Sequence, residues 1–202
     1  MLKSIVRSAH KKLVYDRRTH VLAAKITKLI PDFASVLDVG TGDGHIASLL
    51  QTLRPDLQIE GLDVLVREHT DIPVHWFNGR SLDYNNRSVD VIMFIDVLHH
   101  TSDLGQLLAE AARVARKFVV VKDHLAENTL DHATLKFMDW IGNAPHGVSL
   151  PYNYCSQQSW LNNFVAANLE LTFFDKSLSL YPPPFSYIFG RGLHFIAQLR
   201  PL

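Results

Sequence analysis

Apolar residues at the start of the chain recur at the spacing of a helix, and cationic residues lie on the opposite side of the same segment. This pattern predicts an amphipathic helix with a basic face over residues 2–13. A second helical pattern runs from residue 21 to Ile30, and Pro31 stops it.

From residue 35 the pattern changes to short apolar runs that alternate with helical segments. Helices are predicted over 45–53 and 103–116, and Ser102 is expected to cap the second of them. The predicted strands are 35–39, 57–63, 73–78, 88–98 and 118–123. Such alternation is typical of βαβ units in a parallel sheet, and an almost continuous apolar run such as 88–98 suits a strand covered on both faces.

After residue 123 the order of elements differs. Two helical patterns, 130–143 and 156–169, precede two β-type segments at 169–181 and 192–200. Consecutive strands with a short connection predict an antiparallel hairpin at or near the edge of the sheet. The sequence has no internal repeat or low-complexity tract, so we expect a single domain over residues 1–202.

Composition narrows the class of protein. Of 202 residues, 47% are hydrophobic and 20% charged, which is ordinary for a soluble globular protein. Cys155 is the single cysteine, which excludes an internal disulfide framework and agrees with a reducing cytosol. No run reaches the roughly 18 apolar residues of a membrane span, and the first residues do not resemble a secretory signal. We therefore expect a cytoplasmic protein. The net charge is zero, but residues 1–30 hold eight Lys and Arg residues and one acidic residue.

The segment VLDVGTGDGH, residues 36–45, joins a predicted buried strand to a helix. Gly40, Gly42 and Gly44 allow the backbone to turn sharply and to approach a ligand closely. In open α/β sheets, ligands bind beyond the carboxyl ends of the strands. Asp63 ends the next strand, where its carboxylate can accept hydrogen bonds from both hydroxyls of a ribose.

Two kinds of nucleoside cofactor fit these features so far. The dinucleotide fingerprint requires a small third residue, but His45 stands there and would obstruct the contact between helix and strand. Asp38 and Asp43 would repel a pyrophosphate, whereas they suit the ammonium group of an amino acid. A ribose joined to a cationic amino-acid tail describes S-adenosylmethionine.

The segments VLDVGTGDGHIA, GLDV and NGRSLDYNNRSVDVIMFIDVLHH and the closing hairpin resemble class I S-adenosylmethionine-dependent methyltransferases. The most similar branch is the small-molecule group that includes the quinone C-methyltransferases. The resemblance implies an α/β, Rossmann-like, doubly wound sheet of seven strands with helices on both faces. It also implies that the sheet is mostly parallel, with an antiparallel last strand inserted beside the sixth.

The resemblance also assigns positions to the cofactor. Asn78 and Gly79 match a pair that contacts the adenine, although the family more often has an aspartate at the first position. The implied cofactor-binding residues are Asp38, Gly40, Gly42, Gly44, Asp63, Val64, Asn78, Gly79 and Asp96.

Catalysis needs a general base only if the acceptor must lose a proton during methyl transfer. His124 follows the fifth predicted strand and titrates near neutrality, so it is the first candidate, and His100 is the second. The alternatives are a hydrogen-bonded loop histidine for His124 and a capping or packing role for His100. No spacing of Cys, His and carboxylates matches a metal site, so we expect no metal.

The acceptor side is expected in an aromatic-rich part of the chain, residues 124–168 and 181–189, which suits a small apolar or aromatic acceptor. Phe137 and Trp140 are counted there, although both could equally be core residues. The predicted parts of the domain are an N-terminal helical lid or anchor (1–30), a cofactor-binding core (34–123), a substrate-side helical insertion (124–168) and a C-terminal hairpin (169–202).

Two further functions stay open. One is a non-catalytic scaffold or sensor that keeps the cofactor fold. The other is a macromolecule methyltransferase, but IDVLHH stands where nucleic-acid and protein methyltransferases carry an Asn/Asp-Pro-Pro-Tyr/Phe tetrad, so no nucleic-acid partner is expected. The basic face of residues 1–14 suggests peripheral contact with a membrane, as an alternative to a lid over the cofactor.

Overall fold

The computed structural model describes residues 15–143 and 151–202, so the helix predicted over 2–13 lies outside the described residues. Its centre is a seven-stranded sheet in the order β3-β2-β1-β4-β5-β7-β6. The strands are β1 (Ser35–Val39), β2 (Gln58–Asp63), β3 (Val74–Trp76), β4 (Val89–Ile95), β5 (Ala115–His124), β6 (Leu169–Asp175) and β7 (His194–Pro201).

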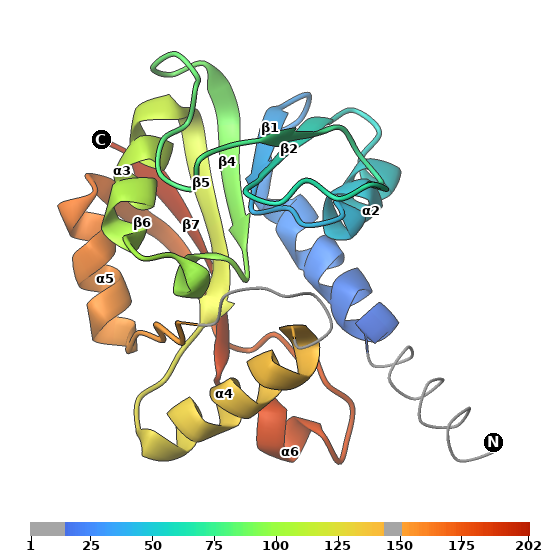
Figure 1. Ribbon diagram of the computed structural model, residues 1–202, viewed down its shortest axis with the longest axis vertical. Coiled ribbons are helices and arrows are strands. Elements are labelled where there is room, and N and C mark those ends of the chain that lie inside the picture. The colour runs from blue at the N-terminus through green and yellow to red at the C-terminus, as the bar shows by residue number, and fades with distance from the viewer. Residues whose placement is uncertain (1–14, 144–150) are drawn as a thin grey trace.

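Helices lie on both faces of this sheet (Figure 1). The first described helix spans residues 15–26 and continues into the 3₁₀ turn η1 (Thr27–Leu29). The others are α2 (His45–Leu53), the 3₁₀ turn η2 (Leu98–His100), α3 (Leu104–Val114), α4 (Thr129–Asn143), α5 (Gln157–Ala166) and α6 (Ser186–Phe189).

The topology confirms the predicted fold class. Strands β1 to β5 pair in parallel, whereas β7 is antiparallel to both β5 and β6 and lies between them. The chain builds outward from β1 in one direction through β2 and β3, and then in the other through β4 and β5. Strand order therefore reverses at β1 and β4, and their carboxyl ends form the edge where such sheets bind ligands.

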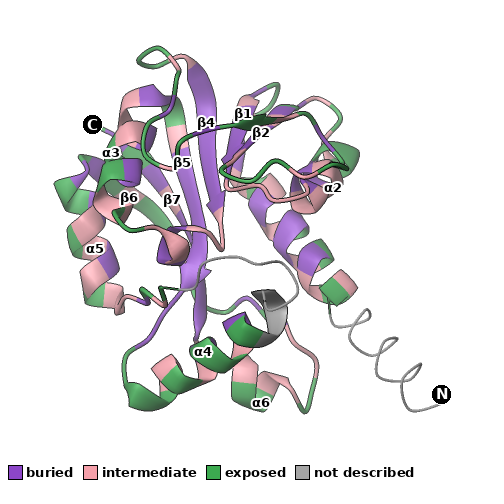
Figure 2. Cartoon of the chain, in the orientation of Figure 1, coloured by how far each residue is buried: buried purple, intermediate pink, exposed green. Residues whose placement is uncertain are grey.

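Successive side chains of a central strand point to opposite faces of the sheet, and each face packs against its own layer of helices. In β4, Val91 and Met93 pack in one buried cluster, with the helix over 15–26 and α2. Ile92 and Phe94 belong to the other cluster, with α3 and α5. Figure 2 shows β4 and β5 buried along most of their length, as the apolar run 88–98 predicts.

Several boundaries differ from the predictions. β4 ends at Ile95 instead of residue 98, because Asp96 adopts a left-handed conformation with φ of 54° and turns the chain into η2. The prediction that Ser102 caps α3 is wrong. Asp103 is the cap, since its carboxylate accepts a hydrogen bond from the Gln106 N–H and can complete the first turn.

Beyond the carboxyl ends of β5 lie α4 and α6 (Figure 1). They place the segments after the fifth strand at the same edge of the sheet as the glycine loop. Within the described ranges, no helix is long and apolar enough to cross a membrane.

Candidate functional site

The glycine loop after β1 is held in place by the acid at the end of β2. The Gly42 N–H donates a hydrogen bond of 2.8 Å to Asp63 Oδ2, and the Leu65 N–H donates one of 2.9 Å to Asp63 Oδ1. Gly40 has a φ of 79°, and a Cβ atom there would lie 2.1 Å from Val97 Cγ2. Only glycine can therefore occupy position 40, and the loop lies directly against the turn after β4.

The two other acids of the loop have different environments. Asp38 is 3% exposed, and burial raises its pKa to about 7, although Thr41 Oγ1 donates a hydrogen bond of 2.6 Å to it. Asp43 is ion-paired with Arg67 at 3.0 Å. Asp38 is thus an interior group, whereas the charge of Asp43 is balanced at the surface.

The positions assigned to the adenine come together after β2 and β3. A Cβ atom on Gly79 would lie 3.1 Å from Val64 Cγ1, so these two residues are in contact. The Asn78 side-chain oxygen accepts hydrogen bonds from the N–H groups of Arg80 and Ser81, at 2.8 and 2.9 Å. Asn78 therefore shapes this turn, and its oxygen is already engaged within the protein.

Asp96, at the start of the turn after β4, is ion-paired with two cationic side chains. Arg18, from the helix over 15–26, and Lys122, from β5, both donate hydrogen bonds to its carboxylate. Burial opposes the charge on Asp96, but Lys122 and Arg18 outweigh it and hold its pKa well below the usual range. Lys122 is completely buried, whereas the side chains of Arg18 and Asp96 are partly buried.

A second buried cluster centres on His99. Its Nδ1 lies 2.6 Å from Asp123 Oδ1, and its Nε2 lies 3.3 Å from Asp139 Oδ2. Burial would lower the pKa of His99, but the two carboxylates raise it to about 10. His99 is therefore an imidazolium cation at neutral pH. Tyr154 donates a hydrogen bond to Asp139 from the other side.

The structure places both candidate bases next to this cation. The ring centroids of His100 and His124 lie 3.9 and 4.5 Å from that of His99. Burial, followed by the charge of His99, lowers the pKa of His100 to about 4 and also lowers that of His124. Both are neutral at pH 7. His100 ends η2 and is separated from α3 by Thr101, Ser102 and Asp103, so it does not cap that helix.

Several members of these clusters were not singled out in the sequence. Lys122 left a visible signal, because it is a charged residue at the end of the apolar run FVVV. The other residues lie in unrelated segments. The residues that the sequence did not single out are Arg18, Lys122, Asp139 and His194.

The aromatic residues expected on the acceptor side differ in how far they are buried. Phe137 and Trp140 are 52% and 58% exposed, so they are not core residues. Their place on the acceptor side remains a prediction. They lie on the outer face of α4, which turns Asp139 and Leu135 inward. Tyr154 and Tyr181 are buried and half-buried and do lie beside the histidines.

In the part of the chain that the structure describes, histidine and aspartate side chains form three overlapping groups whose potential ligand atoms lie within 4.8 Å of one another. The groups are Asp96–His124–His194, His99–Asp123–His124 and His99–His100–Asp139. In each group the carboxylate is already paired with a cation, either Lys122 or His99. A metal ion would have to displace Lys122 from Asp96 in the first group, or a proton from His99 in the other two.

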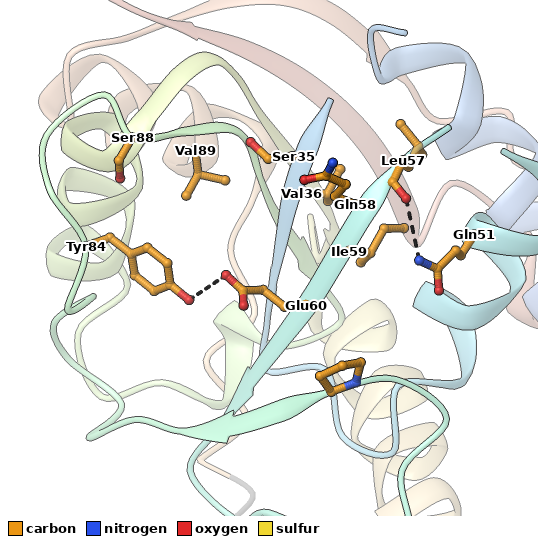
Figure 3. Close-up of a pocket in the computed structure, with 11 residues that line it drawn as sticks. Ser35, Val36, Gln51, Leu57, Gln58, Ile59, Glu60, Tyr84, Ser88 and Val89 are labelled. Atoms are coloured by element: carbon orange, nitrogen blue, oxygen red, sulfur yellow. Dashed lines mark hydrogen bonds between the residues drawn. The ribbon is translucent and has the colours of Figure 1, made fainter. Parts of the chain in front are cut away.

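A groove of about 580 Å³ lies at the opposite end of the sheet (Figure 3). Its lining includes Ser35, Gln58 and Val89, which are the first residues of β1, β2 and β4. Tyr84 and Glu60 also line the groove, and the Tyr84 hydroxyl donates a hydrogen bond to the Glu60 carboxylate. Parallel sheets bind ligands at the carboxyl ends of their strands, so we place the site at the glycine loop and not in this groove.

Comparisons with known proteins identify the family of the chain. A family model described as a methyltransferase domain matches residues 12–172. A search of curated proteins finds no match to the sequence.

Solved structures with the same fold include three methyltransferases. An S-adenosylmethionine-dependent enzyme from Aquifex aeolicus is 17% identical, with a TM-score of 0.64 over 96% of this chain and 98% of the other. One from Mesorhizobium loti is 13% identical, with a TM-score of 0.64 over 88% and 96%. The chain crystallised with the Trm112 methyltransferase activator of Haloferax volcanii is 15% identical, with a TM-score of 0.66 over 96% and 94%. At these identities the likeness establishes the fold.

Proposed function

The chain belongs to the methyltransferase domain family and is an S-adenosylmethionine-dependent methyltransferase, and from this premise we propose that it methylates a small, apolar or aromatic acceptor. One observation carries the proposal. The glycine loop tied to Asp63 and the neutral imidazoles of His124 and His100 lie at the same edge of the sheet, on either side of Asp96.

The residues at this edge fit the cofactor. Among the described residues, the flexible side chain of Arg67 alone borders the space at Gly42, at 3.3 Å. Asp63 presents a half-buried carboxylate beside that space, suited to two ribose hydroxyls. Val64, Asn78 and Gly79 would border the adenine. When bound, the cofactor supplies a methyl group activated by a positively charged sulfur.

The protein's own contribution is alignment and proton transfer. His124 Nδ1 lies 3.2 Å from Asp123 Oδ1, which favours the tautomer with the proton on Nδ1. Its Nε2 then keeps a free electron pair that accepts the proton of the acceptor as the methyl group is transferred. Asp123 and Asp139 fix the neighbouring His99 as a cation, and that charge keeps His124 neutral.

Several predictions from the sequence remain untested. The quinone C-methyltransferase branch, the division into parts and a cytoplasmic location remain predictions. The membrane contact through residues 1–14 lies outside the described residues.

Activity should depend on pH through a neutral histidine. Because only the unprotonated ring accepts a proton, the rate should be low under acidic conditions and reach a plateau above the pKa of the base. That pKa is lowered in the structure, so the rise should lie below the unperturbed value of about 6.5. The measurement is transfer of label from S-adenosylmethionine into the small-molecule fraction of a cell extract, and then into the purified acceptor.

The variants His124→Ala and His100→Ala identify the base, and the exposed His69→Ala is the matched control. The variant that lacks the base should lose at least about a hundredfold in rate, within the range of general base catalysis. Its rate should also no longer vary with pH. Label found only in protein or nucleic acid would refute the small-molecule acceptor. A wild-type rate that does not vary with pH would refute the general base.

A further inference from the structure

Three side chains of the cluster around His99 lie close enough together to hold one metal ion. They are His99 and His100, which end η2, and Asp139, on the inward face of α4. Each offers one potential ligand atom, and these atoms lie within 4.8 Å of one another. The sequence spacing predicts no metal site here, because Asp139 is far from the two histidines along the chain and only the fold brings it to them.

Two nitrogen atoms of this group are buried without a hydrogen-bond partner among the described residues. They are His99 Nε2 and His100 Nδ1. The His99 side chain is only 1% exposed, and its Nε2 lies 3.3 Å from Asp139 Oδ2 without the geometry of a hydrogen bond. Buried polar atoms are almost always paired in folded proteins, so the two nitrogens indicate a partner that binds both of them.

The distance from His99 Nε2 to Asp139 Oδ2 suits two ligands of the same ion. Zinc–nitrogen and zinc–oxygen bonds are about 2.0–2.2 Å long, so neighbouring ligand atoms around a tetrahedral ion lie roughly 3.3–3.6 Å apart. The observed 3.3 Å falls within this range. Three protein ligands would leave a fourth position for water, as in many zinc enzymes.

Neighbouring side chains hold two of these ligands in orientation. A histidine that binds a metal almost always donates its other ring N–H to an acceptor such as a carboxylate, and ligating carboxylates are themselves hydrogen-bonded. His99 Nδ1 lies 2.6 Å from Asp123 Oδ1, and the Tyr154 hydroxyl donates a hydrogen bond to Asp139. The outer contacts that accompany a metal site are therefore present for both.

The ligand atoms favour a transition metal. Imidazole nitrogens suit ions such as Zn²⁺, whereas Mg²⁺ and Ca²⁺ prefer oxygen ligands. The ion would replace the proton on His99 Nε2, and its two charges would balance the carboxylates of Asp123 and Asp139. We propose that His99 Nε2, His100 Nδ1 and Asp139 bind a divalent transition-metal ion, which joins α4 to η2. His124 is not one of these ligands, so it stays available as the base.

Calorimetry with zinc chloride on the metal-free full chain, without an affinity tag, tests the proposal. The wild type should bind one equivalent of Zn²⁺ that excess Mg²⁺ does not displace. His100→Ala removes a ligand and Asp139→Asn removes the charge of another, so each should weaken binding by more than about a hundredfold. Tyr154→Phe should weaken it by about 10–100-fold, the usual effect of an outer-shell partner. The exposed His69→Ala is the matched control and should bind like the wild type.

Hydrogen exchange distinguishes this site from loose binding at surface histidines. Because the ion joins α4 to η2, Zn²⁺ should slow the exchange of backbone amides in α4 of the wild type. It should have no such effect in Asp139→Asn. Circular dichroism checks that each variant is folded, and if Asp139→Asn is not, the half-buried His100→Ala takes its place.

Three results would overturn the proposal. The first is that the wild type binds no equivalent of Zn²⁺. The second is an affinity that His100→Ala and Asp139→Asn leave unchanged, since the ion would then occupy other histidines. The third is unchanged exchange in α4 of the Zn²⁺-loaded wild type. All titrations are made without S-adenosylmethionine, so their result does not depend on the methyl-transfer function.

Discussion

Replacing Gly42 with valine is expected to abolish binding of S-adenosylhomocysteine, raising its Kd by at least about a hundredfold, or ~2.8 kcal/mol. Gly42 has a φ of 67°, which a β-branched residue rarely adopts. Its N–H is also the link to Asp63, so a shift of the loop would move the ribose-binding acid. The valine side chain would in addition fill the space that the ligand needs. Isothermal titration calorimetry measures the loss.

The chain offers a matched control at Gly192. It has a φ of 79°, and no described atom lies within 4 Å of the Cβ that a substitution would add. Gly192→Val therefore introduces similar backbone strain far along the chain from the loop, without filling a ligand site. It should bind S-adenosylhomocysteine like the wild type. Equal loss of affinity in both variants would show that strain, and not the loop, is responsible.

Replacing Asp123 with alanine is expected to lower the free energy of unfolding by about 3–5 kcal/mol, the usual effect of removing one partner from a buried ion pair. The carboxylate pairs with His99 and accepts hydrogen bonds from the N–H groups of Leu98 and His124, at 3.1 and 2.7 Å. Without it, these buried donors lose their acceptor and His99 keeps Asp139 as its carboxylate partner. Urea denaturation at pH 7 measures the change.

Asp83→Ala removes an exposed carboxylate and provides the control for this experiment. Its free energy of unfolding should stay within about 0.5 kcal/mol of the wild type, as for most surface substitutions. If Asp123→Ala were as stable as Asp83→Ala, the cluster around His99 would not be an ion-paired network. His124 would then lack the neighbouring cationic His99 that helps to lower its pKa.

The cofactor half of the site was predictable because its signals are local. The strand 35–39, the three glycines and the helix 45–53 form one continuous segment, and the structure has both elements at these bounds. Asp63 was found because it directly ends the next apolar run. Patterns of this kind depend on neighbouring residues in the sequence, and one chain is enough to reveal them.

The histidine clusters were not predictable in the same way. Arg18 and Asp96 are 78 positions apart, and His99 and Asp123 are 24 apart, so only the fold brings them together. The sequence suggested His124 and His100 from their place after strands, but not the cation between them. Without His99, the expected pKa of each base was the ordinary one, whereas the structure lowers both.

Binding of S-adenosylhomocysteine by the wild type and Asp63→Ala, measured by calorimetry, tests the central claim most directly. The claim is that the glycine loop and Asp63 hold the methyl donor. The wild type should bind, and Asp63→Ala should bind at least about tenfold more weakly, because hydrogen bonds to a charged group contribute about 1.5–3 kcal/mol. Asp83→Ala should bind like the wild type. Undetectable binding by the wild type, or equal affinity in Asp63→Ala, would contradict the account.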